Sequence, residues 1–337
     1  MKNIVSLLLL SSVWILSPSC RNQNTPPKTN PGSDTTAAAL EDINVRLRSN
    51  PGDASLYQER ARFFIARKKF DEALADMNRV LKIDSTKAEY YLTLADVYFM
   101  ANKTRDSRTA LEKCNKLDPK NKECIMKLAE LYFYVRKYQQ SLNYLDEALK
   151  LDQYNAKAYF MKGMNFKESG DTAKAISSMQ TAVEQDNGYY NAYIQLGLLC
   201  AAQHNKLAED YYANALRIQP NSTEALYDAG ILYQQEGNYE KAQMLYKKLL
   251  ELNKNLFDGY YNLGVISVAT KEYKEALNYF SQAISVDPKN ARGYYGRGYC
   301  YQMMGNVQNG SADYRYALTL DPDFEAAKTG LKEMKIY

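Results

Sequence analysis

The sequence has few of the residues on which enzymes and all-β proteins depend. Its 337 residues include one histidine, His204, and only 16 glycines and 9 prolines. So few turn-forming residues argue against an all-β protein. There is no glycine-rich phosphate loop, no HExxH pair and no nucleophile elbow, and the carboxylates are scattered along the chain. We therefore expect no enzyme, no cofactor and no metal site, with His204 an ordinary surface residue in a turn.

A long apolar run is also absent. Residues 4–16 are apolar apart from three serines, and a membrane-spanning helix needs about 20 such residues. With Lys2 before it and small residues before Cys20, the run has the parts of a secretory signal peptide, which we assign to residues 1–19. Cys20 at the expected cut resembles the lipobox of bacterial lipoproteins, although Ser17 stands where that motif usually has Leu. We expect lipidation of Cys20, with a soluble exported protein as the alternative.

The segment after Cys20 has no aliphatic or aromatic side chain and contains three prolines. Residues 20–36 are therefore predicted to be a flexible tether. Arg21, rather than Asp, after the cysteine resembles lipoproteins that are sorted to the outer membrane. The net charge of +4 is too small to suggest nucleic-acid binding. We expect an exported outer-membrane lipoprotein that faces the periplasm or the cell surface.

The remaining chain repeats itself every 34 residues. Three tracks of mostly small residues keep this period over eight copies, with a single step of 33. The first track is Ala61, Ala95, Ala129, Gly163, Gly197, Gly230, Gly264 and Gly298. The second is Ala73, Ser107, Ser141, Ala175, Ala208, Ala242, Ala276 and Gly310, and the third is Val80, Cys114, Ala148, Ala182, Ala215, Leu249, Ala283 and Ala317. Three tracks with one period indicate a repeat protein.

The hydrophobic pattern predicts two helices in each copy. Places are numbered from Ala54, Ala88, Lys122, Ala156, Tyr190, Thr223, Phe257 and Ala291. Because the fifth copy lacks one residue between Gly197 and Ala208, its later places are counted as in the other copies. Apolar residues recur near places 4, 7, 8 and 11 and again at places 20, 24 and 27, with a polar turn between the stripes and prolines at or beside place 32. This spacing is typical of a helical hairpin that ends before proline.

The pattern resembles the tetratricopeptide repeat, in which small residues occupy places 8, 20 and 27 and proline occupies place 32. Residues 257–288 show it best. The resemblance implies an all-α fold, a tandem helix-turn-helix array of about eight repeats over residues 54–323 that forms a right-handed α-solenoid superhelix. Residues 37–53 are predicted to form an N-terminal half repeat, and residues 324–337 a C-terminal capping helix that covers the last core face.

The resemblance also implies where a partner binds. In this family, the stripe through places 5, 9 and 12 of the first helix faces a concave groove. The first three copies make this stripe mixed and charged, as in Gln58, Arg62 and Asp96. In the last five copies the predicted groove residues are Phe160, Met164, Ile194, Leu198, Tyr227, Ile231, Tyr261, Val265, Tyr295 and Tyr299. Aromatic residues and Met are enriched at protein-binding surfaces. We expect place 5 to be exposed, whereas place 9 is either exposed or packed against the next repeat.

The predicted function is a non-enzymatic scaffold or adaptor of the bacterial cell envelope that holds partner proteins or extended peptide segments in this groove. The carboxylate clamp known in the family needs Lys at place 5, and no copy has it, so recognition through that clamp is not expected. A different class stays open, a glycan-binding lipoprotein of a nutrient-uptake system. There, the rings of Tyr261, Tyr295 and Tyr299 would stack on sugars.

The remaining cysteines raise the question of a disulfide. Cys114 and Cys124 lie five residues on either side of Pro119, where one predicted helix turns into the next. They could face each other, and an oxidising periplasm would allow a disulfide. We favour the alternative of two small buried thiols. Cys200 and Cys300 are three repeats apart and are not expected to pair.

Overall fold

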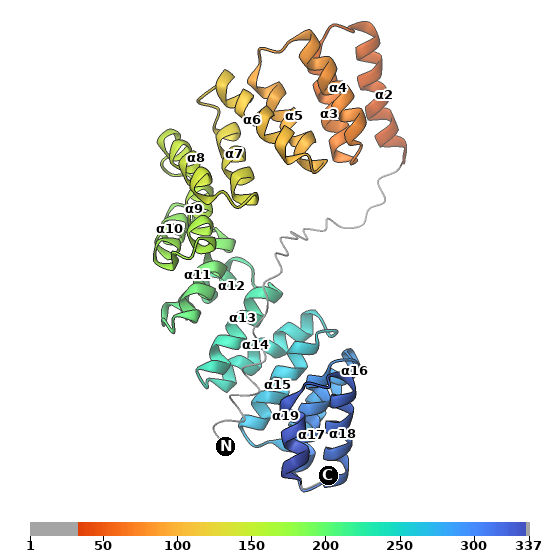
Figure 1. Ribbon diagram of the computed structural model, residues 1–337, viewed down its shortest axis with the longest axis vertical. Coiled ribbons are helices and arrows are strands. Elements are labelled where there is room, and N and C mark those ends of the chain that lie inside the picture. The colour runs from red at the N-terminus through yellow and green to blue at the C-terminus, as the bar shows by residue number, and fades with distance from the viewer. Residues whose placement is uncertain (1–32, 335–337) are drawn as a thin grey trace. The chain divides into compact units, whose positions relative to one another are not determined.

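A computed structural model describes residues 33–334, which form eighteen α-helices and no strand (Figure 1). The predicted signal peptide, Cys20 and the tether up to residue 32 lie outside the described residues. The first helices of the repeats are α3 (Ala54–Ala66), α5 (Ala88–Met100), α7 (Lys122–Tyr134), α9 (Ala156–Glu168), α11 (Tyr190–Ala202), α13 (Thr223–Gln235), α15 (Phe257–Ala269) and α17 (Ala291–Met303). The second helices are α4 (Phe70–Ile83), α6 (Thr104–Leu117), α8 (Tyr138–Leu151), α10 (Thr172–Gln185), α12 (Leu207–Ile218), α14 (Tyr239–Leu252), α16 (Tyr273–Val286) and α18 (Val307–Leu320).

This order confirms the predicted all-α fold of tandem helical hairpins. Each first helix begins at the residue from which its copy was numbered. Two further helices flank the eight hairpins, α2 (Ser33–Ser49) and α19 (Glu325–Glu333). The α2 helix begins four residues before the predicted start at residue 37. The chain divides inside α11, between Ala192 and Tyr193, into two compact units.

Complementary side-chain sizes close each hairpin. From the fourth copy on, place 8 is glycine, and a Cβ added there would lie 2.5–2.9 Å from the large place 24 side chain of the same copy. The pairs are Gly163–Met179, Gly197–Tyr212, Gly230–Tyr246, Gly264–Phe280 and Gly298–Tyr314. In the first three copies, place 8 is alanine and place 24 is Met77, Leu111 or Leu145, none of which has an aromatic ring. The small residue at place 8 therefore makes room for the buried place 24 side chain of the second helix.

The turn inside each hairpin has a left-handed residue at place 15. In all eight copies this residue has a positive φ; it is glycine at Gly170, Gly237 and Gly305, and another residue at Lys68, Asn102, Arg136, His204 and Lys271. The next N–H group bonds back to the carbonyl of place 11, as from Lys137 to Tyr132 at 2.8 Å. This is the Schellman arrangement that ends a helix. His204 occupies this place in the fifth copy, and its side chain is exposed.

The turn between hairpins is held by a carboxylate or amide at place 31. In seven of the eight copies, the side chain of Asp or Asn at this place accepts a bond from the N–H two residues on. Such an Asx turn favours a change of chain direction and competes with further helix. The two outermost hairpins each also have a bidentate ion pair between their helices, Arg60–Asp76 and Arg297–Asp313, with N–O distances of 2.6–2.8 Å.

Candidate functional site

The predicted groove residues divide into an accessible set and a buried set. Phe160, Met164, Leu198, Tyr227, Ile231 and Tyr299 are half-buried, and each keeps part of its side chain at the surface. Ile194, Tyr261, Val265 and Tyr295 are buried, with only 1–6% of their surface exposed. The expectation that place 5 is exposed is thus wrong for Ile194, Tyr261 and Tyr295. At place 9, Val265 is packed inside the protein, which was one of the two alternatives for that place.

Packing of aromatic rings explains the buried tyrosines. The Tyr261 ring lies 5.6 Å from that of Phe257 and 5.5 Å from that of Phe280, and the Arg292 guanidinium lies 4.1 Å from its centroid. Tyr295 packs in the same way against Tyr314, with ring centroids 5.6 Å apart. Because place 8 is glycine in these copies, the place 24 ring reaches far enough to cover place 5.

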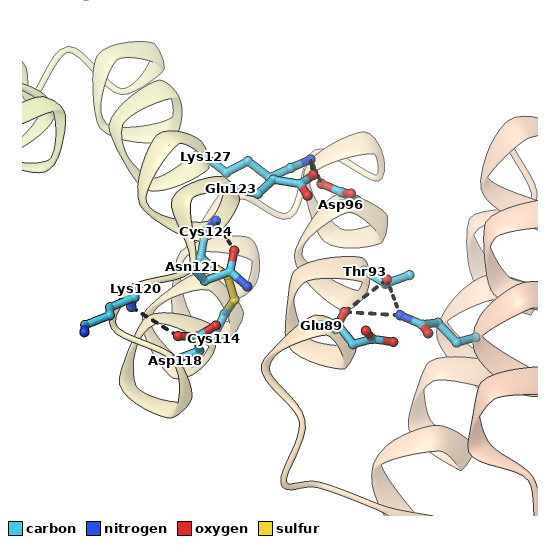
Figure 2. The surroundings of a disulfide bond; sticks show 11 residues. Glu89, Thr93, Asp96, Cys114, Asp118, Lys120, Asn121, Glu123, Cys124 and Lys127 are labelled. Atoms are coloured by element: carbon cyan, nitrogen blue, oxygen red, sulfur yellow. Dashed lines mark hydrogen bonds and ion pairs between the residues drawn. A yellow bond between two sulfur atoms is a disulfide. The ribbon is translucent and has the colours of Figure 1, made fainter. Parts of the chain in front are cut away.

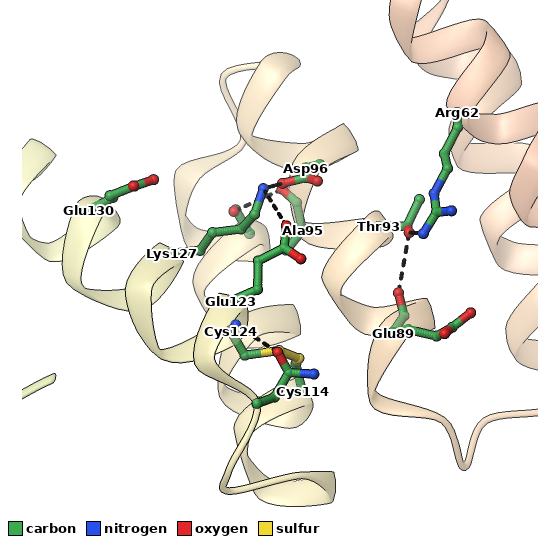
Figure 3. A network of polar contacts seen from close by, with 12 residues as sticks. Arg62, Glu89, Thr93, Ala95, Asp96, Cys114, Glu123, Cys124, Lys127 and Glu130 are labelled. Carbon is green, nitrogen blue, oxygen red and sulfur yellow. Dashed lines mark hydrogen bonds and ion pairs between the residues drawn. A yellow bond between two sulfur atoms is a disulfide. The ribbon is translucent and has the colours of Figure 1, made fainter. Parts of the chain in front are cut away.

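In the unit that ends at Ala192, charged groups along the same stripe are paired inside the protein. The Lys127 ammonium at place 6 lies 2.6 Å from Asp96, which is place 9 of the preceding copy (Figure 3). One copy earlier, Arg62 at place 9 donates to Thr93 at place 6 over 3.4 Å. Glu130, also at place 9, pairs with Lys157 at 2.6 Å. A polar residue at place 6 thus contacts place 9 of the copy before it, and the two carboxylates at place 9, Asp96 and Glu130, are each paired with a lysine.

A disulfide joins the second and third repeats. Cys114 near the end of α6 and Cys124 near the start of α7 are bonded, with their Cα atoms 6.2 Å apart (Figure 2). Both are fully buried. Asn121 caps α7 and its side chain accepts from the Cys124 N–H at 3.1 Å, which holds that cysteine in the first turn. The structure therefore has a disulfide where we favoured two free thiols, because the turn at Pro119 is tight enough to bring the two helix ends together.

The two other described cysteines are free and buried. Burial raises the pKa of the Cys300 thiol to about 12 and also raises that of Cys200. A thiol with a raised pKa is a poor nucleophile at neutral pH.

A pocket opens between α11 and α13, in the unit that begins at Tyr193. It is lined by Leu198, Ala201, Ala202, Tyr212, Asp228, Ile231, Leu232 and Gln235 and has a volume of about 180 Å³. One water needs roughly 10–15 Å³ of such space, so the pocket has room for a side chain. Two of the predicted groove residues, Leu198 and Ile231, form part of its wall.

Asp228 is the one charged side chain among these lining residues. Within residues 33–334, no hydrogen bond or ion pair engages its carboxylate. Burial, with a smaller contribution from the negative charge of Glu224 one turn earlier, raises the pKa of Asp228 to about 7. Burial also raises the pKa of the Tyr212 hydroxyl, and the Asp228 charge contributes. The pocket therefore combines apolar side chains with one carboxyl group that has no partner among the described residues.

Sequence reasoning missed Asp228, Tyr212 and Gln235 because it took only places 5, 9 and 12 as groove positions. A signal was present in the repeat itself. Place 6 contacts place 9 of the preceding copy, and the residue there before Asp228 is Leu198. An acid opposite an apolar residue at this pair of places marks a charge that the array leaves unpaired.

Neither a metal site nor a spanning helix is found in the part of the chain that the structure describes. No group of three or more His, Cys, Asp or Glu side chains there could hold a metal ion. None of the helices from α2 to α19 combines the length and apolarity needed to cross a bilayer.

Comparison with known families places tetratricopeptide repeats along much of the chain. Profiles of the tetratricopeptide repeat match residues 126–190, 222–289 and 261–323. A profile of the anaphase-promoting complex (cyclosome) subunit 3 matches residues 66–148. These matches show tetratricopeptide repeats in residues 126–190 and 222–323, and the other hairpins have the same architecture. Repeats of this class generally mediate protein–protein interactions.

Individual relatives are more distant. Photosystem I assembly protein Ycf3 of Acaryochloris marina is 32% identical over 88 residues, which is 25% of this chain and 52% of that protein. The match thus spans about half the length of this relative. The C-terminal part of a tetratricopeptide-repeat protein of Cytophaga hutchinsonii has a TM-score of 0.62 and 22% identity, covering 71% of this chain and 98% of that structure. A tetratricopeptide repeat protein of Parabacteroides merdae has a TM-score of 0.50 and 18% identity over 74% of this chain and 98% of its own. These two structures show the shared fold.

Proposed function

We propose that the protein is a non-enzymatic scaffold that holds a segment of a partner protein against the first helices of its repeats. The observation that carries the proposal is the accessible apolar stripe formed by Leu198, Tyr227 and Ile231, which continues into the pocket between α11 and α13. Half-buried aromatic and aliphatic side chains around a pocket are typical of the centre of a protein interface. The similarity to a photosystem assembly protein agrees with a role in bringing proteins together.

The proposal includes export and a lipid anchor at Cys20, which places the scaffold in the bacterial envelope. Its support is the short apolar run before Cys20 and the featureless segment after it. The Cys114–Cys124 disulfide agrees with export, since disulfides persist in oxidising compartments. The Cys20→Ala variant should leave the membrane fraction. If it sediments with membranes as the wild type does, the anchor is not at Cys20.

Partner capture from envelope extracts tests the scaffold. The variant Tyr227→Ala/Ile231→Ala should lose proteins that the wild type retains, because each change removes an apolar side chain from the stripe. Met244→Ala is the matched control, since Met244 is an apolar side chain on α14 with 64% of its surface exposed, outside the stripe. Retention of the same proteins by both variants would rule out this surface.

The glycan-binding alternative loses support from the structure. It needs free ring faces on Tyr261, Tyr295 and Tyr299, and the first two are buried against other aromatic rings. Only Tyr299 keeps part of its surface accessible. Polysaccharide binding measured in parallel with protein capture separates the two classes.

A further inference from the structure

We propose that the pocket between α11 and α13 binds a lysine or arginine side chain of the partner segment, with the Asp228 carboxylate as its counter-charge. The inference rests on the proposed scaffold function and names the chemistry that one part of its surface recognises.

The first argument is the lack of any internal partner for this acid. An ionised carboxylate in an apolar site is costly unless it is paired and hydrogen-bonded. Tyr212 and Gln235 line the same pocket, yet among the described residues no donor is bonded to Asp228. The one charge that contributes to its raised pKa is that of Glu224, which has the same sign. A cation from outside would supply what the fold lacks.

The second argument is a comparison of equivalent places. Lys127 occupies place 6 of the third repeat, as Asp228 does in the sixth. Lys127 has its counter-charge 2.6 Å away, Asp96 at place 9 of the preceding repeat. At that place before Asp228 stands Leu198, which lines the pocket. Places 6 and 9 thus form an internal ion pair between the third and second repeats. The same two places of the sixth and fifth repeats hold an acid and an apolar residue beside the pocket.

The third argument concerns the shape of the ligand. Leu198, Ile231 and Leu232 offer apolar contact, and Asp228 offers a charge at one point of a pocket of about 180 Å³. Lysine and arginine combine a long apolar stem with a cationic head, and each buries the stem while the head finds a polar partner. A short acidic or purely apolar side chain would leave either the walls or the carboxylate unsatisfied.

The test uses side-chain mimics and the purified protein labelled with ¹³C at the aspartate carboxyls. The signal of Asp228 is assigned by its loss in Asp228→Asn. We expect n-butylguanidinium and n-butylammonium to lower the pKa of this signal, whereas 1-pentanol, of similar length and without charge, should not. Asp228→Asn should weaken n-butylguanidinium binding about tenfold, the size of one charge-assisted hydrogen bond, and leave 1-pentanol binding unchanged. The relative affinities of the two cations distinguish arginine from lysine.

A second variant fills the slot from within. Leu198→Lys should restore the pairing seen at Lys127 and Asp96, so it should lower the pKa of Asp228 without any probe and abolish n-butylguanidinium binding. Equal n-butylguanidinium affinity in wild type and Asp228→Asn would overturn the proposal, as would a pKa of Asp228 that Leu198→Lys does not move. Asp228→Asn removes a half-buried charge and Leu198→Lys pairs it, so the circular dichroism and thermal unfolding of both variants should remain those of a folded protein.

The cation-binding test and the partner-capture test can fail independently. If envelope partners are captured through Tyr227 and Ile231 and the cations do not bind, the pocket proposal fails and the scaffold stands. If the cations bind and no protein is captured, the pocket is a cation site and the scaffold fails.

Discussion

At the scale of single residues, the pairing of place 8 with place 24 sets how closely the two helices of a hairpin approach. The Phe280 ring is fully buried and lies between Gly264 and Gly296, and a Cβ added at either glycine would be within 2.7 Å of it. A ring so enclosed cannot swing away as a flexible chain end would. A side chain as large as Phe280 therefore fits only because Gly264 and Gly296, on the neighbouring helices, have no side chain.

Gly264→Ala should destabilise the protein. Overpacking costs about 1–3 kcal/mol, while alanine regains about 1 kcal/mol of helix propensity. The double variant Gly264→Ala/Phe280→Leu recreates the Ala–Leu combination of the second and third repeats and should recover part of the loss. Urea unfolding of the four members of this cycle measures the coupling. Additive effects, or a single variant as stable as the wild type, would mean that the two residues do not compete for space.

A second residue-scale prediction concerns the left-handed turn position. Arg136 has a φ of 58°, which costs a non-glycine residue roughly 1–2 kcal/mol relative to glycine. Arg136→Gly should therefore raise the free energy of unfolding by about 0.5–1 kcal/mol, since glycine also gives the unfolded chain more freedom.

Gly170 provides the reverse experiment. It occupies the same place with a φ of 87°, and no atom lies within 4 Å of an added Cβ. Gly170→Ala tests backbone strain without a clash and should lower stability by about 1 kcal/mol. Effects of the same sign in Arg136→Gly and Gly170→Ala would contradict strain as the cause.

At the scale of elements, the disulfide ties the end of α6 to the start of α7. It closes a loop of only ten residues, for which the chain-entropy estimate is about 2–3 kcal/mol. Adding dithiothreitol should lower the unfolding free energy of the wild type to that of Cys114→Ala/Cys124→Ala, and should leave this variant unchanged. Cys200→Ala should respond to the reductant as the wild type does. Recovery of alkylated Cys114 and Cys124 from the unreduced native protein would show that the bond is absent in solution.

At the scale of the whole molecule, the sequence predicts the fold well because one period is repeated eight times. A single copy gives an ambiguous pattern, whereas shared small places fix where each first helix begins, as at Ala54 and Phe257. The site is less predictable. Whether Tyr261 is exposed depends on the reach of Phe280, nineteen residues later in the chain, and that reach depends on Gly264. Repeat statistics describe an average copy, and function lies where one copy departs from it, as at Asp228.

The nearest-neighbour construction of the array also predicts what its ends do. Each hairpin buries one face against the next, so a terminal face needs a cover. Helix α19 supplies it: Ala327 is fully buried, and Gly330 lies against the Tyr314 ring with no room for a Cβ. Phe324, just before α19, packs on Tyr295 at 5.1 Å between ring centroids.

Ending the chain after Pro322 should therefore expose the eighth repeat and leave distant repeats unaffected. Amide exchange followed by mass spectrometry should show faster exchange in α17 and α18, on the order of tenfold for each 1.4 kcal/mol of lost local stability. Exchange in α3 to α6 should stay as in the wild type. Lys332→Ser, at an exposed position of the same helix, is the control for a change that leaves the cover in place. Uniformly faster exchange along the whole chain would instead mean that the repeats unfold as one cooperative unit, because removing the cover of the eighth repeat would then also destabilise the first repeat.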